Sequence, residues 1–143
     1  MHRLDRAANG LILVAHSKRM AAELAKIFRS RKIEKRYRAL VTGTFTSDAD
    51  PLRIDAPIDG KEALSEVSLL SVSDDGEQSL VEVRIATGRK HQIRRHLAAL
   101  GHAVVGDRLY GNGKADDVDL QLQAFLLAFR CPVSDRKVEY RLA

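Results

Sequence analysis

Two segments of the chain carry apolar residues at the spacing of an amphipathic helix. The first runs from about 18 to 30, and Ser17 stands before it as an N-cap. Its apolar stripe is formed by Met20, Leu24, Ile27 and Phe28. A shorter helix is predicted from about 89 to 100, ended by Gly101. Its inward stripe is formed by Ile93, Leu97 and Leu100.

The remaining apolar runs predict strands. Residues 11–15 form a continuous apolar run, typical of a strand that is covered on both faces. The turn sequence Asp74-Asp75-Gly76 separates two β-rich runs and indicates a hairpin. The other strand candidates, hairpin arms included, are 36–43, 63–73, 80–87, 120–129 and 138–142. This order predicts an α+β fold: one domain over residues 1–143, with a mixed, mostly antiparallel sheet and short flanking helices.

Composition fits an ordinary globular protein with an anionic partner. The 143 residues are 45% hydrophobic and carry a formal net charge of +5. The single cysteine, Cys131, cannot form a disulfide within the chain, and no apolar run is long enough to span a membrane. We therefore expect a cytoplasmic, monomeric protein.

Charge is distributed unevenly along the chain. Residues 17–36 hold eight Lys and Arg against two Glu, whereas residues 48–77 hold nine Asp and Glu against two basic residues. A second basic cluster lies at 89–96. Solvated surfaces would explain either segment alone, but two separated basic segments favour a nucleic-acid-binding surface.

The first candidate for chemistry is Asp5, in the segment His2-Arg3-Leu4-Asp5. In an extended chain Arg3 and Asp5 point to the same side. An arginine there keeps the carboxylate ionised, as a nucleophile requires. An ordinary ion pair at the end of a loop is the simpler alternative for these residues taken alone.

The second candidate is the cationic run that contains Arg94. One residue beyond Ile93, Arg94 lies about 100° around the helix, at the border of the core, where its guanidinium can reach inward to a carboxylate. His91 and His96 are five residues apart and do not match the i, i+4 pair of a helical zinc site, so we expect no metal. A helix that contacts phosphate is the better interpretation.

Taken together, these segments resemble the RluA-type pseudouridine synthases. The resemblance runs from His2 to near the C-terminus, and three blocks in the right order carry it: 2–5 with 10–15, 35–43, and 87–111. The tail 122–125 also matches the family's late strand, where histidine commonly stands at the position of Gln123.

The resemblance assigns roles to individual residues. Asp5 matches the catalytic aspartate that initiates detachment of uracil from its ribose, and Tyr37 the tyrosine that stacks on the uracil. Arg94 matches the basic partner of that aspartate, Ile93 its apolar neighbour, and Arg3 the arginine that fills the gap left by the flipped base. RNA contacts are expected from Arg89, Lys90, His91 and Arg95. Asp107 and Tyr110 are interpreted as scaffold.

The implied reaction converts a specific uridine of ribosomal or transfer RNA to pseudouridine by base flipping, without a cofactor. The sequence departs from the family in two ways. Ala8-Asn9-Gly10 stands where Thr-Ser-Gly is usual, and Met1 directly precedes the first motif, where the family carries further strands. We therefore expect a truncated domain, with an inactive RNA-binding remnant as the alternative function. A sugar-bond hydrolase is disfavoured because no second placed carboxylate is evident.

Overall fold

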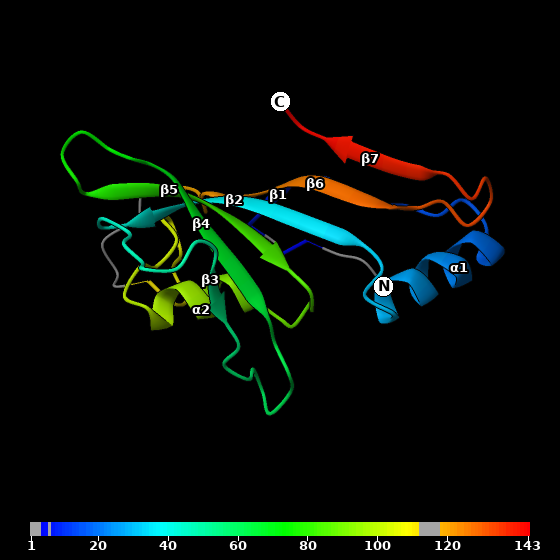
Figure 1. The fold of residues 1–143 in the computed structure, drawn as a ribbon, viewed down its shortest axis with the longest axis horizontal. Coiled ribbons are helices and arrows are strands. Elements are labelled where there is room, and N and C mark those ends of the chain that lie inside the picture. Colours follow the sequence, from blue (N-terminus) through cyan, green and yellow to red (C-terminus); the bar gives the residue numbers. More distant parts are fainter. Residues whose placement is uncertain (1–3, 6, 112–117) are drawn as a thin grey trace.

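One seven-stranded sheet forms the centre of the molecule (Figure 1). The structure is a computed structural model that describes residues 4–5, 7–111 and 118–143. The strand order is β1-β6-β2-β5-β4-β3, and β7 pairs with the far end of β6. Among the described strands the β1–β6 pair alone is parallel, so the predicted mixed, mostly antiparallel sheet is confirmed. The strands are β1 (Asn9–Gly10), β2 (Glu34–Thr42), β3 (Leu52–Ile54), β4 (Ser65–Val72), β5 (Gln78–Ile85), β6 (Leu122–Arg130) and β7 (Lys137–Arg141).

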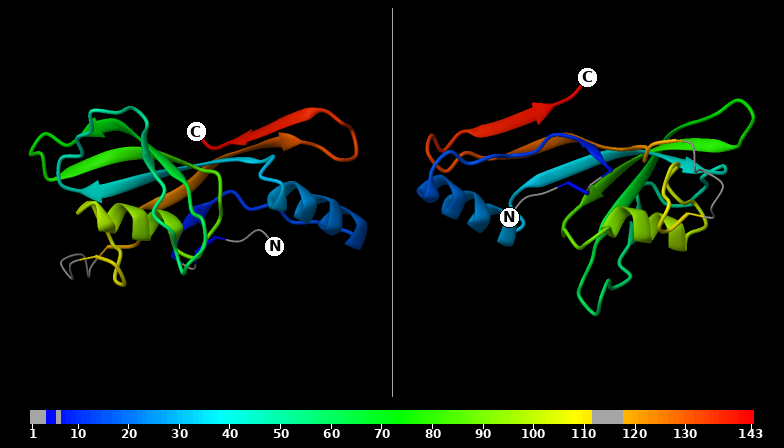
Figure 2. Two further views of the ribbon diagram at one scale, coloured as in Figure 1. Left: turned by 60° about the horizontal axis from the view of Figure 1, so that its bottom comes forward. Right: turned by 180° about the vertical axis from the view of Figure 1, so that it is seen from behind.

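Two helices lie on one side of this sheet (Figure 2). Helix α1 (Lys18–Arg29) begins after Ser17, whose hydroxyl accepts a hydrogen bond from the Met20 N–H at 3.1 Å. Helix α2 (Gln92–Ala99) places Ile93 and Leu97 in the main core, against strands β2, β4 and β5. No helix of the described part of the chain is long and apolar enough to cross a membrane.

Successive side chains of each strand point to opposite faces, and this alternation gives the sheet a core-facing side and a charged side. On β2, Ala39 and Val41 are fully buried in the main core. Arg36, with the opposite parity, pairs with Glu34 at 2.6 Å and with Glu82 at 3.1 Å. Tyr37 shares the parity of the core residues, and this places it on the side that carries both helices.

Three expectations for the elements need correction. Residues 11–15 are not a strand covered on both faces. Leu11 and Leu13 pack against the apolar cluster next to α1 that Ile33, Leu127 and Phe129 form. Ile12 and Val14 point away from this cluster and are 51% and 68% exposed. Helix α2 begins three residues later than predicted, since His91 before it has a left-handed φ of 54°. Leu100 is 41% exposed and does not belong to the inward stripe.

The contact between β1 and β6 requires a glycine. Gly10 has a φ of +118°, and a Cβ on it would collide with the backbone carbonyl of Ala124. Only glycine combines this φ with so close an approach of two strands. Asp5 and Ala8, which precede Gly10, thereby come close to Leu122 at the start of β6.

Candidate active site

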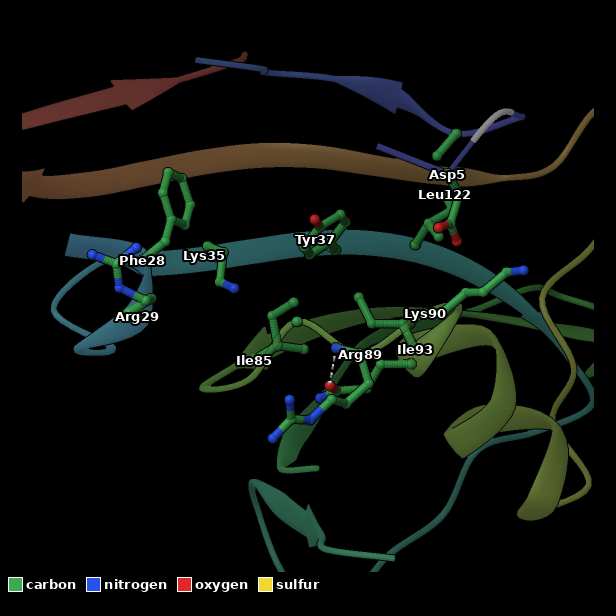
Figure 3. A pocket seen from close by; sticks show the side chains of 13 residues that line it. Asp5, Phe28, Arg29, Lys35, Tyr37, Ile85, Arg89, Lys90, Ile93 and Leu122 are labelled. Carbon is green, nitrogen blue, oxygen red and sulfur yellow. Dashed lines mark hydrogen bonds between the residues drawn. The ribbon is translucent and has the colours of Figure 1, made fainter. Parts of the chain in front are cut away.

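Asp5 lies at the edge of a cavity between β2 and the loop before α2 (Figure 3). Its backbone carbonyl accepts a hydrogen bond from the Ala8 N–H at 2.9 Å, which closes a turn just before β1. The Asp5 side chain is 25% exposed, so its carboxylate is open to the cavity while the backbone is fixed. The cavity has a volume of about 440 Å³.

Arg94 places a positive charge beside Asp5. Its Nη1 lies 3.8 Å from Asp5 Oδ2, so α2 directs the guanidinium inward. The stronger partner of Arg94 is Asp107, which accepts hydrogen bonds from Nε at 2.9 Å and from Nη2 at 2.7 Å. Both side chains are buried. Arg94 is therefore fixed by Asp107 and offers its remaining edge to Asp5.

The carboxylate of Asp107 is held in its charged form. Burial alone would raise the pKa of Asp107, but hydrogen bonds from Arg94 and from the N–H groups of Tyr110 and Leu109 outweigh that effect and lower it. The pKa of Arg94 is raised, chiefly by its hydrogen bonds to Asp107. The pair is thus permanently charged at neutral pH.

Tyr37 points into the same cavity from the middle of β2 (Figure 3). Burial, with the negative charge of Asp5 as a second cause, raises its pKa to about 12. The phenol consequently stays neutral at physiological pH and can act as a flat, uncharged surface and as a hydrogen-bond donor. Ile93 and Leu122 add apolar walls beside it.

The cavity brings together five of the nine site residues expected from the sequence. Asp5, Tyr37, Ile93, Arg89 and Lys90 all line it. Arg94 joins them through its contact with Asp5.

Two other expected site residues, His91 and Arg95, are not among the described residues that line the cavity. His91 contacts the Tyr110 hydroxyl through Nδ1 at 2.7 Å. Arg95 forms two hydrogen bonds to the exposed carboxylate of Asp59, at 3.1 and 3.2 Å. Arg3 falls outside the described residues. RNA contacts by these three residues stay predictions.

A buried hydrogen-bond network fixes the loop that carries Arg89 and Lys90. The Gln92 side-chain oxygen accepts from the Thr87 hydroxyl at 2.6 Å and from the Arg89 N–H at 3.1 Å. Its amide nitrogen donates to the Leu64 carbonyl at 2.8 Å and to Ser65. Because Gln92 is buried, these bonds attach the start of α2 firmly to β4.

Sequence reasoning gave no site role to Lys35 or Arg29 and only a scaffold role to Asp107. Lys35 lines the cavity and is only 8% exposed, although its position next to Arg36 gives no reason to expect a buried lysine. The sequence did not predict that Asp107 binds Arg94 directly. The two residues are thirteen positions apart, and the fold brings them together. The signal that could have found Lys35 is its spacing of two residues from Tyr37 on a strand.

Among the described residues, no three His, Cys, Asp or Glu side chains gather in a group that could hold a metal ion. The described residues that line the cavity offer one carboxylate, one neutral phenol and several cations. Such a set suits nucleophilic or proton-transfer chemistry on a ligand that is itself anionic.

Comparisons with known proteins agree with this arrangement. Residues 1–99 match the family model described as RNA pseudouridylate synthase. The chain is 35% identical to the dual-specificity RNA pseudouridine synthase RluA of Pasteurella multocida, over 97% of this chain and 70% of that protein. It is 32% identical to the ribosomal large subunit pseudouridine synthase D of Zymomonas mobilis, over 98% of this chain and 50% of the relative.

Comparison of the fold with solved structures also finds an RNA pseudouridylate synthase domain. The solved structure of human RNA pseudouridylate synthase domain containing 1 superposes with a TM-score of 0.84 at 29% identity, covering 99% of this chain and 67% of that one. An RNA pseudouridine synthase of Aquifex aeolicus is 39% identical over 78% of this chain, and the chain covers only 39% of its length. The chain thus spans between about two fifths and seven tenths of the curated relatives named here. Sequence, fold and cavity agree that this chain belongs to the RNA pseudouridine synthases of the RluA type.

Proposed function

We propose that this chain isomerises a uridine in RNA to pseudouridine and that Asp5 is its catalytic carboxylate. The observation that carries the proposal is the meeting of Asp5 and Tyr37 at one cavity, where the other charged residues among the described lining are all cations. A single carboxylate suits an isomerisation, in which one group opens the glycosidic bond and the same base is reattached.

The residues around Asp5 fit distinct steps of that reaction. Asp5 initiates the detachment of uracil from its ribose, and Arg94, fixed by Asp107, keeps the carboxylate in place. The reattached base is bonded through C5, so the C5 hydrogen leaves and N1 gains a proton. Tyr37 and Ile93 supply flat and apolar contacts that replace the stacking lost when the base leaves the RNA helix.

The expected substrate is ribosomal or transfer RNA. Cations around the cavity (Arg29, Lys35, Arg89 and Lys90) supply favourable electrostatics for the phosphate backbone. Relatives named for ribosomal large-subunit and dual-specificity synthases support structured RNA as the target class. Cofactor independence, a monomeric state and a cytoplasmic location stay predictions from the sequence, as does a single catalytic domain over 1–143.

The direct test is to incubate uridine-containing ribosomal and transfer RNA with the chain and with Asp5→Ala, and to analyse the nucleosides after digestion. Pseudouridine formed by the unmodified chain alone supports the proposal. If neither protein forms pseudouridine while both bind RNA with the same salt dependence, the chain is an RNA-binding remnant instead.

A further inference from the structure

Lys35 is a buried cation with no anionic partner among the described residues. It lies on β2 two residues before Tyr37, so both side chains leave the same face of the strand. Lys35 is only 8% exposed and lines the cavity. Within the described residues its ammonium makes no hydrogen bond or ion pair, and its one charge-related contact is the Phe28 ring, whose centroid lies 5.9 Å from Nζ.

Such a group is costly to the protein on its own. Removing an ammonium from water without a compensating partner is strongly unfavourable, and burial accordingly lowers the pKa of Lys35. An anion that enters the cavity beside it offsets this cost. A buried lysine that lines an open cavity, with no anion beside it among the described residues, is therefore suited to bind an anionic ligand.

The surroundings of Lys35 define the charge of that ligand. Figure 3 shows Lys35 and Arg29 toward one end of the cavity and Asp5 at the other, with Tyr37 between them. Arg89 lines the cavity as well, and its Nε donates to the Glu62 carbonyl at 2.6 Å. Asp5 is the one carboxylate among the described lining residues. A neutral uracil carbonyl would need only one hydrogen-bond donor. Several cations around one cavity instead favour a negatively charged ligand such as a phosphodiester.

We propose that Lys35 binds a phosphodiester of the RNA directly next to the uridine whose base lies between Asp5 and Tyr37. The proposal rests on the proposed function and names a further substrate-binding residue of the same site. Two residues along a strand span roughly 7 Å. That separation leaves room for one ribose between a base held at Tyr37 and a phosphate held at Lys35.

Gly88 keeps the approach to this ammonium open. A Cβ at residue 88 would lie 3.3 Å from Lys35 Nζ, closer than ordinary van der Waals contact. A larger side chain there would occupy the space in which a phosphate oxygen would sit. Gly88 is exposed and has no left-handed φ, so a substitution tests this space without forcing the backbone into strain.

The test is a double-mutant cycle between Lys35 and single RNA phosphates. All proteins carry Asp5→Asn, so the RNA stays unreacted and only binding is measured. The probe is a short uridine oligonucleotide in which the linkage on the 5′ or on the 3′ side of the central uridine is an uncharged methylphosphonate. Lys35→Met removes the ammonium, Lys35→Arg keeps a cation, and Lys61→Met removes an exposed charge elsewhere.

At one of the two linkages, loss of the phosphate charge weakens binding to the Lys35 protein by about tenfold or more. The same loss leaves binding to Lys35→Met nearly unchanged. Lys35→Arg retains most of the sensitivity, and Lys61→Met retains all of it. Gly88→Val reproduces the effect of Lys35→Met, while thermal unfolding shows that each variant is folded.

The assignment of Lys35 is overturned if, at both linkages, the losses of RNA affinity from the methylphosphonate and from Lys35→Met simply add. This holds whatever the Asp5 experiment gives. Coupling at one linkage in a chain that forms no pseudouridine supports the phosphate contact and contradicts the proposed catalysis. Absence of RNA binding by the protein with Lys35 intact overturns both. The two proposals therefore fail in distinguishable ways.

Discussion

Arg94 binds Asp107 through two hydrogen bonds, at 2.9 and 2.7 Å, and approaches Asp5 only to 3.8 Å. Asp107 thus determines where the guanidinium lies, and Asp5 faces a cation that is already anchored. Asp107 also accepts hydrogen bonds from the N–H groups of Leu109 and Tyr110, which fixes the segment after it. One buried carboxylate therefore links α2, this segment and the candidate nucleophile.

Replacing Asp107 should destabilise the protein strongly. Asp107→Asn leaves the buried Arg94 charge without its anion, and breaking such a pair costs about 3 kcal/mol or more in the free energy of unfolding. Urea denaturation measures this loss. The matched control is Asp59→Asn, which breaks the exposed pair with Arg95 and should change stability far less. Equal losses in the two variants would contradict the anchoring role of Asp107.

Tyr37 should titrate well above an ordinary tyrosine. The absorbance of the phenolate, taken as the difference between the protein and Tyr37→Phe, is expected to have a midpoint near pH 12. Because the folded pKa lies above the usual value of 10.0, the contribution of Tyr37 to stability is complete below pH 10 and is lost as the pH rises toward 12.

Asp5 contributes to this shift, so Asp5→Asn should lower the midpoint of Tyr37. Burial is the larger cause, and the midpoint should therefore remain above 10 in the variant. An unchanged midpoint would mean that the carboxylate does not face the phenol.

Gly10 should tolerate no side chain. Gly10→Ala places a Cβ against the Ala124 carbonyl and forces β1 away from β6, in addition to the cost of a positive φ for alanine. Gly60→Ala is the control, because Gly60 also has a positive φ, +74°, but a methyl group on it would meet no atom within 4 Å. Thermal unfolding should show a clearly larger loss for Gly10→Ala; similar losses would refute the close approach.

Gln92 should be needed to hold the loop that carries Arg89. Gln92→Leu keeps the volume but leaves the Arg89 N–H and the Leu64 carbonyl without their partner, at about 1–3 kcal/mol each when buried. Gln121→Leu removes an exposed amide that bonds to the Asp119 carbonyl, and it should be nearly neutral in the same urea experiment. A neutral Gln92→Leu would show that the network does not stabilise the loop.

Local patterns are sufficient to predict most of the elements. Helix α1 follows from the Ser17 cap and its apolar stripe, and the β4–β5 hairpin from Asp74-Asp75-Gly76. Both depend on interactions within a few residues. The prediction of a buried strand at 11–15 is wrong because burial depends on neighbours far away in the chain, and Ile12 and Val14 remain largely exposed.

Some features of the site likewise follow from local sequence motifs, and others depend on long-range packing. The family motifs lead to Asp5, Tyr37 and Arg94, and the structure brings these three together. The anchoring by Asp107 depends on long-range packing that no local pattern contains. Lysine is ordinarily a surface residue, so the burial of Lys35 is not predictable from its type.

The role of Asp5 is tested most directly by the release of tritium from RNA labelled at C5 of uridine, measured with excess protein in a single turnover. The unmodified chain and Asp48→Asn, which removes an exposed carboxylate, should release tritium at the same rate. Asp5→Asn should be slower by on the order of a thousandfold or more while it still binds the RNA. Equal rates for Asp5→Asn and the unmodified chain would contradict the assignment of Asp5 as the catalytic residue.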